Sequence, residues 1–126
     1  MVTSFKTQGI TTTLQNLVAL LELEEEDDYG ILRPNDYAFK TAMNWALEAH
    51  TILKNDFPQA SASTDHLGGV RLTWKNSDQK LTVRLTCPAD PTQPADLYHS
   101  SPDDYAVEDL TSVATLVRWL EWLNLA

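Results

Sequence analysis

The chain has 126 residues, a formal net charge of −9 and a sequence pI of about 4.5. This length suits a single domain that spans residues 1–126 and has a core of its own. The excess of carboxylates disfavours nucleic acids and anionic membranes as partners, because both gain affinity from Lys and Arg. One cysteine cannot form an internal disulfide framework, and it fits a reducing, cytoplasmic setting. No stretch has the roughly 20 apolar residues that would cross a bilayer, and the N-terminus does not read as a signal peptide.

The first part of the chain predicts two helices separated by an acidic break. Thr11–Thr13 offer N-caps for a helix over about 13–25, whose leucines recur at helical spacing. Six of the seven residues over 22–28 are acidic, and negative charge opposes the dipole at a helix C-terminus, so the helix should end or fray there. Asn35 predicts the N-cap of a second helix that runs to about Asn55. We expect residues 1–12 and 22–30 to be the mobile parts of the domain.

Alternating apolar and polar residues predict two antiparallel strands, about 67–75 and 80–87, joined by a turn at 76–79. Their apolar rows are Val70, Leu72 and Trp74 in the first strand and Leu81, Val83 and Leu85 in the second. Residues 59–64 and 96–100 predict further strands, and residues 105–107 a short edge strand. The expected fold is α+β, a three- or four-stranded antiparallel meander with the second and last helices packed on one face.

The last helix should start at Asp109 or Thr111 and run to about Asn124. Trp119 and Trp122 widen its apolar side well beyond a normal core stripe, so this helix must bury more than one side. Two arrangements would cover it. Two copies of the helix would pair about a two-fold axis in a homodimer, or the N-terminal helix of the same chain would lie over it.

Two charged segments and the two tryptophans are the predicted contacts for a protein partner of unknown identity. The acidic run would attract a basic partner, and a solvated charge block is the alternative. Basic residues on the polar strand face form a second patch, for which the alternative is a face that discourages edge pairing. Trp74 lies on the opposite face, so this patch lacks the interleaved aromatic residues that single-stranded nucleic acid needs. The candidate partner-binding residues are Glu24, Glu25, Glu26, Asp27, Asp28, Arg71, Lys75, Arg84, Trp119 and Trp122.

The residues that could carry catalysis do not form a recognisable motif. Cys87 and His99 could act as a thiol nucleophile and its base, but the alternation points Cys87 into the core. The three histidines lack the close spacing of a two-His metal site. We therefore expect no catalytic residue, no metal and no cofactor in a non-enzymatic interaction or regulatory module. The alternative is a small-molecule-binding or hydrolytic domain that uses His99 and the Asp103–Asp109 loop.

Three motifs carry a family resemblance. Residues 61–74 read S-x-S-T-x-x-x-G-G-V-x-L-x-W, a Tyr-Gly-x-x-x-Pro turn spans 29–34, and the last helix contains Trp119-Leu120. Together they cover most of residues 29–123 and resemble a set of small bacterial proteins that are similar to accessory or antitoxin-like partners of toxin–antitoxin loci. The resemblance implies a fold more than a chemistry, and it carries over no catalytic residue.

Overall fold

The computed structural model describes residues 8–28 and 30–125. Its elements in chain order are α2 (Gln8–Ala19), the 3-10 turn η1 (Leu20–Glu22), β1 (Glu26–Asp27), β2 (Gly30–Ile31), α3 (Asp36–Leu53), η2 (Lys54–Asp56), β3 (Ser61–Thr64), β4 (Val70–Asn76), β5 (Leu81–Cys87), β6 (Asp96–Ser100), β7 (Tyr105–Asp109) and α4 (Val113–Leu125). Strands β1 and β2 form a separate hairpin.

Strands β3 to β7 form one antiparallel sheet in which each strand pairs with its neighbours in the sequence. The α+β class is confirmed, but the sheet has five strands instead of the predicted three or four. Both short flanking strands, β3 and β7, join it because tight connections return the chain antiparallel beside β4 and β6. The register aligns Leu72 with Leu85 and Leu85 with Leu97, so the apolar rows share one face.

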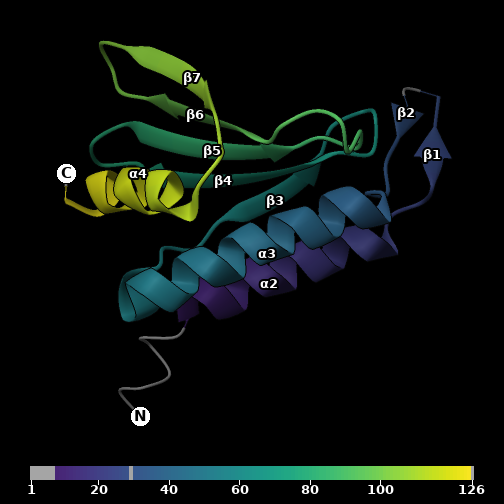
Figure 1. Ribbon diagram of the computed structural model, residues 1–126. Helices are drawn as coiled ribbons and strands as arrows, with labels where there is room; N and C mark the ends of the chain where they lie inside the picture. The colour runs from purple at the N-terminus through teal and green to yellow at the C-terminus, as the bar shows by residue number, and fades with distance from the viewer. Residues whose placement is uncertain (1–7, 29, 126) are drawn as a thin grey trace.

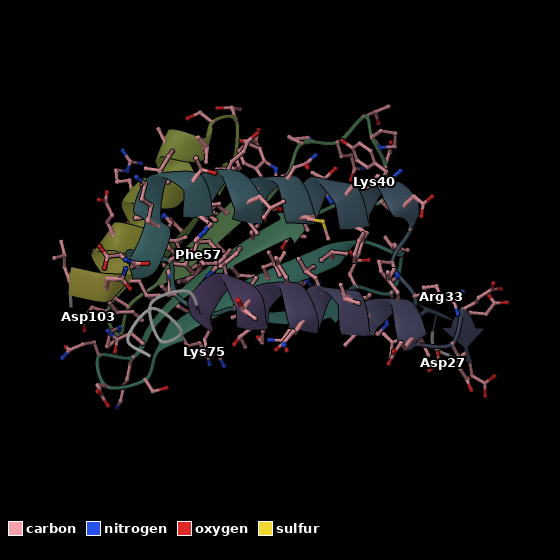
Figure 2. The ribbon with its side chains drawn as sticks, turned by 90° about the horizontal axis from the view of Figure 1, so that it is seen from below. Asp27, Arg33, Lys40, Phe57, Lys75 and Asp103 are labelled. Carbon is pink, nitrogen blue, oxygen red and sulfur yellow. The ribbon has the colours of Figure 1, made fainter. Side chains whose placement is uncertain are left out.

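The helices lie on this apolar face, and no element of the described chain covers the other face (Figure 1). Figure 2, from the helix side, shows α2 and α3 running side by side. α2 packs on β3 and α3, whereas α4 packs on α3, β4 and β5. The sequence predicts that the second and last helices, α3 and α4, pack on the sheet, and the structure adds the first helix, α2, to the same layer. The fully buried residues Ala38, Ala42, Ala46 and Ala49 give α3 a narrow side that comes close to its neighbours.

The first helix lies earlier in the chain than the predicted 13–25. Thr13 does not cap it, because its buried hydroxyl donates to the Gly9 carbonyl at 2.8 Å and accepts the Ala60 N–H at 2.9 Å. Gly9 permits close packing, since a Cβ there would collide with the Phe57 carbonyl oxygen. Helical structure does end before residues 23–28, as the dipole argument predicts. Of the segment expected to be mobile, residues 8–12 belong to this helix and residues 1–7 lie outside the described chain.

Asn35 caps α3 as predicted and also ties the helix to the sheet. Its Oδ1 accepts the Ala38 N–H at 2.8 Å, which satisfies one free donor of the first turn. Its Nδ2 donates to the Ala89 carbonyl at 3.0 Å, and its backbone N–H donates to the Gly68 carbonyl at 2.9 Å. One residue, through its side chain and its backbone, therefore fixes the start of α3 against the loops that flank β4 and β5.

The last helix starts later than predicted. Ser112 caps it in place of Asp109 or Thr111, because its hydroxyl accepts the Ala114 N–H at 3.2 Å while Asp109 belongs to β7. Among the helices that the structure describes, none combines the length and apolar composition that crossing a membrane requires.

Candidate interaction site

A cluster of four side chains joins the last two strands to α4. His99 of β6 stacks on Trp119, with ring centres 3.6 Å apart and planes at 16°, and Trp122 meets Trp119 edge-on at 5.2 Å. Glu108 of β7 lies beside both rings. Its Oε2 accepts the Trp119 Nε1–H at 3.3 Å and lies 3.4 Å from His99 Nε2. The tryptophans of the last helix thus pack on residues of β6 and β7. Of the two alternatives for covering this helix, cover by the N-terminal helix is wrong because α2 packs on β3 and α3, and pairing of two copies stays a prediction.

A hollow of about 220 Å³ opens beside this cluster, between the end of β6, the start of β7 and α4. His99, Trp119 and Trp122 line it with their rings, and Asp104, Tyr105 and Ala106 complete its wall, although the Tyr105 ring itself turns to the open face beside Tyr98. Most pockets for small molecules enclose roughly 300–1,000 Å³, so this hollow is better matched to one side chain of a partner than to a whole substrate.

The hydrogen bonds that flank β7 determine which of its backbone groups face β6. The Ser101 N–H donates to the Asp104 carbonyl at 2.8 Å, and the Leu110 N–H donates to the Ala95 carbonyl at 2.8 Å. Hydrogen-bonded pairs alternate along an antiparallel ladder, and both flanking pairs continue the β6–β7 register. The N–H and C=O groups of residues 106 and 108 therefore point toward β6, and those of residues 105, 107 and 109 point to the free edge.

This free edge presents unpaired backbone groups and exposed side chains. Asp104 Oδ1 accepts the Tyr105 N–H at 2.8 Å, so Val107 is the central residue with both backbone groups turned outward. The Tyr105 and Val107 side chains are 71% and 59% exposed. β7 contains no Pro or Lys, and its charges are the carboxylates of Glu108 and Asp109, which discourage pairing with an acidic strand but not with a basic one. The edge can therefore accept an added strand.

The uncovered face of the sheet combines basic and aromatic residues. Arg71, Lys75 and Arg84 share this face, as the strand pattern predicts. The Arg84 guanidinium carbon lies 5.2 Å from the centre of the Tyr98 ring, and the ring centres of Tyr98 and Tyr105 lie 6.2 Å apart. The expectation that this face lacks aromatic residues is thus wrong, because β6 and β7 supply them beside the basic strands. The alternation of β6 itself could have shown this, because Tyr98 directly follows the buried Leu97 and must point to the opposite face.

Carboxylates interrupt the basic patch at one end of the same face. Arg71, Thr86, Asp96 and Asp109 occupy one row across β4 to β7. Partial burial, and then the negative charge of Asp109, raises the pKa of Asp96 above its ordinary value, while Arg71 and a hydrogen bond from Thr86 oppose the rise. The face is therefore mixed in charge.

The acidic run contains strand β1 of the small hairpin β1–β2 and the segment that leads into it. Residues 22–28 are all exposed. Arg33 holds the hairpin to the chain, with its Nε donating to the Leu23 carbonyl at 3.1 Å and its NH1 lying 3.7 Å from Glu25. Asp27 points outward in Figure 2, and Figure 1 shows the hairpin at the opposite end of the molecule from β7. The fold therefore does not bring the acidic run to the tryptophans, and the mobility of 22–30 stays a prediction.

Cys87 and His99 are not brought together. Both point to the helix side, but His99 pairs with Val83, four residues from Cys87 along β5, which is about 13 Å. Burial, and then the nearby charge of Asp96, raises the pKa of the Cys87 thiol to about 12, so it stays protonated and unreactive. Within residues 8–28 and 30–125, no three His, Cys, Asp or Glu side chains form a group suited to a metal ion.

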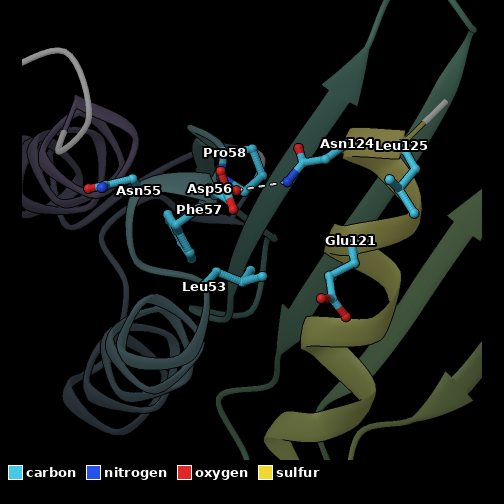
Figure 3. Close-up of a pocket in the computed structure, with 8 residues that line it drawn as sticks. All are labelled: Leu53, Asn55, Asp56, Phe57, Pro58, Glu121, Asn124 and Leu125. Carbon is cyan, nitrogen blue, oxygen red and sulfur yellow. Dashed lines mark hydrogen bonds between the residues drawn. The ribbon is translucent and has the colours of Figure 1, made fainter.

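A larger hollow, of about 520 Å³, lies between the end of α3 and α4 (Figure 3). Asn124 Nδ2 bridges it by donating to the Asp56 carbonyl at 2.8 Å. Its two carboxylates, Asp56 and Glu121, are exposed, and no His, Cys, Ser or Lys lines it. Its chemistry gives no reason to assign it a reaction.

No protein-family model matches this chain, and no match was found among curated proteins or solved structures. The resemblance to antitoxin-like proteins therefore depends on the sequence motifs alone.

Proposed function

We propose that this protein is a non-catalytic module that binds a protein partner by adding a strand of that partner to the free edge of β7. The observation that carries the proposal is the outward N–H and C=O of Val107 on an exposed edge strand that lacks Pro and Lys. Strand addition gains affinity from main-chain hydrogen bonds and specificity from alternate side chains. A regulatory or antitoxin-like role, which the sequence motifs suggest, would act through such binding.

Charge supports a basic partner. Asp103 and Asp104 precede β7, and Glu108 and Asp109 end it, so carboxylates flank both ends of the edge strand. A partner strand with Lys or Arg would meet opposite charge here, whereas an acidic strand would be repelled. The net charge of −9 adds a long-range field of the same sign.

The test uses isotope-labelled protein and a short peptide of alternating Val and Lys, followed by amide chemical shifts. We expect the largest shifts in residues 105–109. Val107→Pro removes the outward N–H without removing a bond to β6, because residues 106 and 108 make those bonds. It should weaken binding about tenfold or more, while Val107→Thr, which keeps the N–H, should bind like the wild type. Shifts confined to another surface, or equal binding by the Pro variant, would refute strand addition at β7.

A second candidate is the hydrolytic domain that uses His99. Its support is the Glu108 carboxylate 3.4 Å from His99 Nε2, which could orient the ring, and the Ser101 hydroxyl beside the same hollow. Hydrolysis of activated esters by the wild type and by His99→Gln tests it. Equal rates in two folded proteins would remove this candidate.

A further inference from the structure

The hollow beside His99 lies on the helix side of the sheet, next to the start of β7, the strand to which a partner strand would add. Three rings that the fold holds in place line it, those of His99, Trp119 and Trp122. Trp119 is fixed on one side by the His99 stack and at its N–H by Glu108. Trp122 meets both rings edge-on, at 5.2 Å from Trp119 and 6.3 Å from His99. Such fixed aromatic groups bind cations without the cost of ordering them first.

Two observations indicate that this hollow suits a positive charge. Carboxylates flank it, with Asp104 in its wall and Glu108 next to Trp119. Trp122 is the second, because Trp119 is already stacked on His99 and contacted by the Arg118 guanidinium carbon at 5.5 Å, which leaves Trp122 as the indole ring that can meet a further cation in the hollow. Arg118 itself is exposed and does not line the hollow.

Strand geometry connects the hollow to the edge of β7. Side chains of an added strand alternate between the two faces of the sheet. Those that align with Ala106 and Glu108 must point to the helix side, where the hollow opens. Those that align with Tyr105 and Val107 must point to the open face, where these two side chains offer apolar contact.

We infer that the hollow receives a Lys or Arg side chain from the partner strand bound at β7, and so selects an extended segment in which basic residues alternate with apolar ones. This inference rests on the proposed function. A second copy of the chain would not supply a Lys or Arg side chain to the hollow. Antiparallel pairing of two β7 strands about Val107 would place Ala106 and Glu108 over the hollow, and Glu108 would add a carboxylate to an acidic site.

The test compares three peptides that carry Lys, norleucine or Glu at alternate positions and Val between them. Affinity is measured by calorimetry, and the site by the amide shifts of residues 105–109. We expect the Lys peptide to bind about 3- to 30-fold more tightly than the norleucine peptide, and the Glu peptide to bind most weakly. Trp122→Leu keeps an apolar wall but removes the ring, so it should reduce the Lys preference to about twofold or less. Tyr37→Leu, an exposed aromatic residue of α3, is the matched control and should leave the preference unchanged.

Asp104→Asn provides an independent variant in case Trp122→Leu perturbs folding. It keeps the oxygen that accepts the Tyr105 N–H and removes the charge, so the Lys preference and its salt dependence should both fall. If Lys and norleucine peptides bind equally and both shift the β7 amides, the inference is wrong and the proposed function stands. If no peptide shifts these amides, both are wrong. Concentration-dependent dimerisation that Val107→Pro abolishes would instead identify a second copy as the occupant and overturn the inference.

Discussion

Trp74→Ala should be the most destabilising single substitution in the sheet. Trp74 lies on β4, is fully buried, and meets Phe57 edge-to-face with ring centres 6.1 Å apart. Its Nε1 donates to the Pro58 carbonyl at 2.9 Å, so the side chain joins the sheet to the segment that follows α3. Truncating a buried aromatic to Ala costs about 3–5 kcal/mol, because the transfer free energy is lost and a cavity remains.

This loss is a large fraction of the roughly 5–15 kcal/mol that stabilises a typical domain. A chain of this size loses about 4 °C of melting temperature per kcal/mol, which predicts a fall of roughly 12–20 °C. Trp74→Phe keeps most of the ring but leaves the Pro58 carbonyl without its donor, and should cost about 1–3 kcal/mol.

Urea unfolding followed by far-UV circular dichroism measures both variants, with Lys75→Ala as the matched control. Lys75 is the next residue on β4 and is exposed on the opposite face, so its removal should change the free energy of unfolding by no more than about 0.5 kcal/mol. Equal effects of the Trp74 and Lys75 substitutions would refute the assignment of the buried face.

Replacing the three glutamates at 24–26 by Gln should leave the fold and the free energy of unfolding essentially unchanged, because these exposed charges repel one another and the ion pair of Glu25 with Arg33 is solvated. Unfolding of this variant, seen by circular dichroism, would mean that the fold depends on the acidic run. Asp96→Asn should stabilise the protein at pH 7, because burial and then the charge of Asp109 disfavour the native carboxylate. The pKa of Asp96 in the native protein lies above the ordinary value of 3.8, so as the pH falls the native carboxylate takes up a proton before that of the unfolded chain. The gain in the free energy of unfolding of the Asn variant, measured by urea titration, should therefore shrink as the pH falls through the native pKa. A gain that grows on acidification would contradict this. The Cys87 thiol, with its pKa raised to about 12, should resist iodoacetamide at pH 8 in native protein and react in urea; rapid native labelling would contradict its burial.

The local patterns of the sequence were sufficient to predict most elements of the sheet and α3. Alternation predicted the buried side of β4 and β5, since a strand's two faces are set by residue parity alone. The Asn35 cap predicted the start of α3, because the cap is a contact between residues three positions apart. The same argument failed for α2, where the Thr13 hydroxyl bonds to Ala60 in a distant segment instead of capping the helix.

The candidate site depended on contacts that no local pattern contains. The alternation within a strand shows which of its side chains share a face, but it does not show which strand lies beside it. The contact between Tyr98 of β6 and Arg84 of β5 therefore does not follow from the sequence. Trp119 and Trp122 were recognised as unusual, yet their cover by His99 and Glu108 required β6 and β7 to close over α4.

By itself the sequence determined the α+β class, the buried row that includes Trp74, the core position of Cys87 and the excess of negative charge. These follow from periodicity and composition, which involve residues close together in the chain. The tertiary structure decided that β7 is an edge strand, that Val107 turns its backbone outward there, and that an aromatic hollow opens next to the start of this strand. Those features depend on the order and register of strands that are brought together only when the helices and the sheet bury their apolar faces against one another.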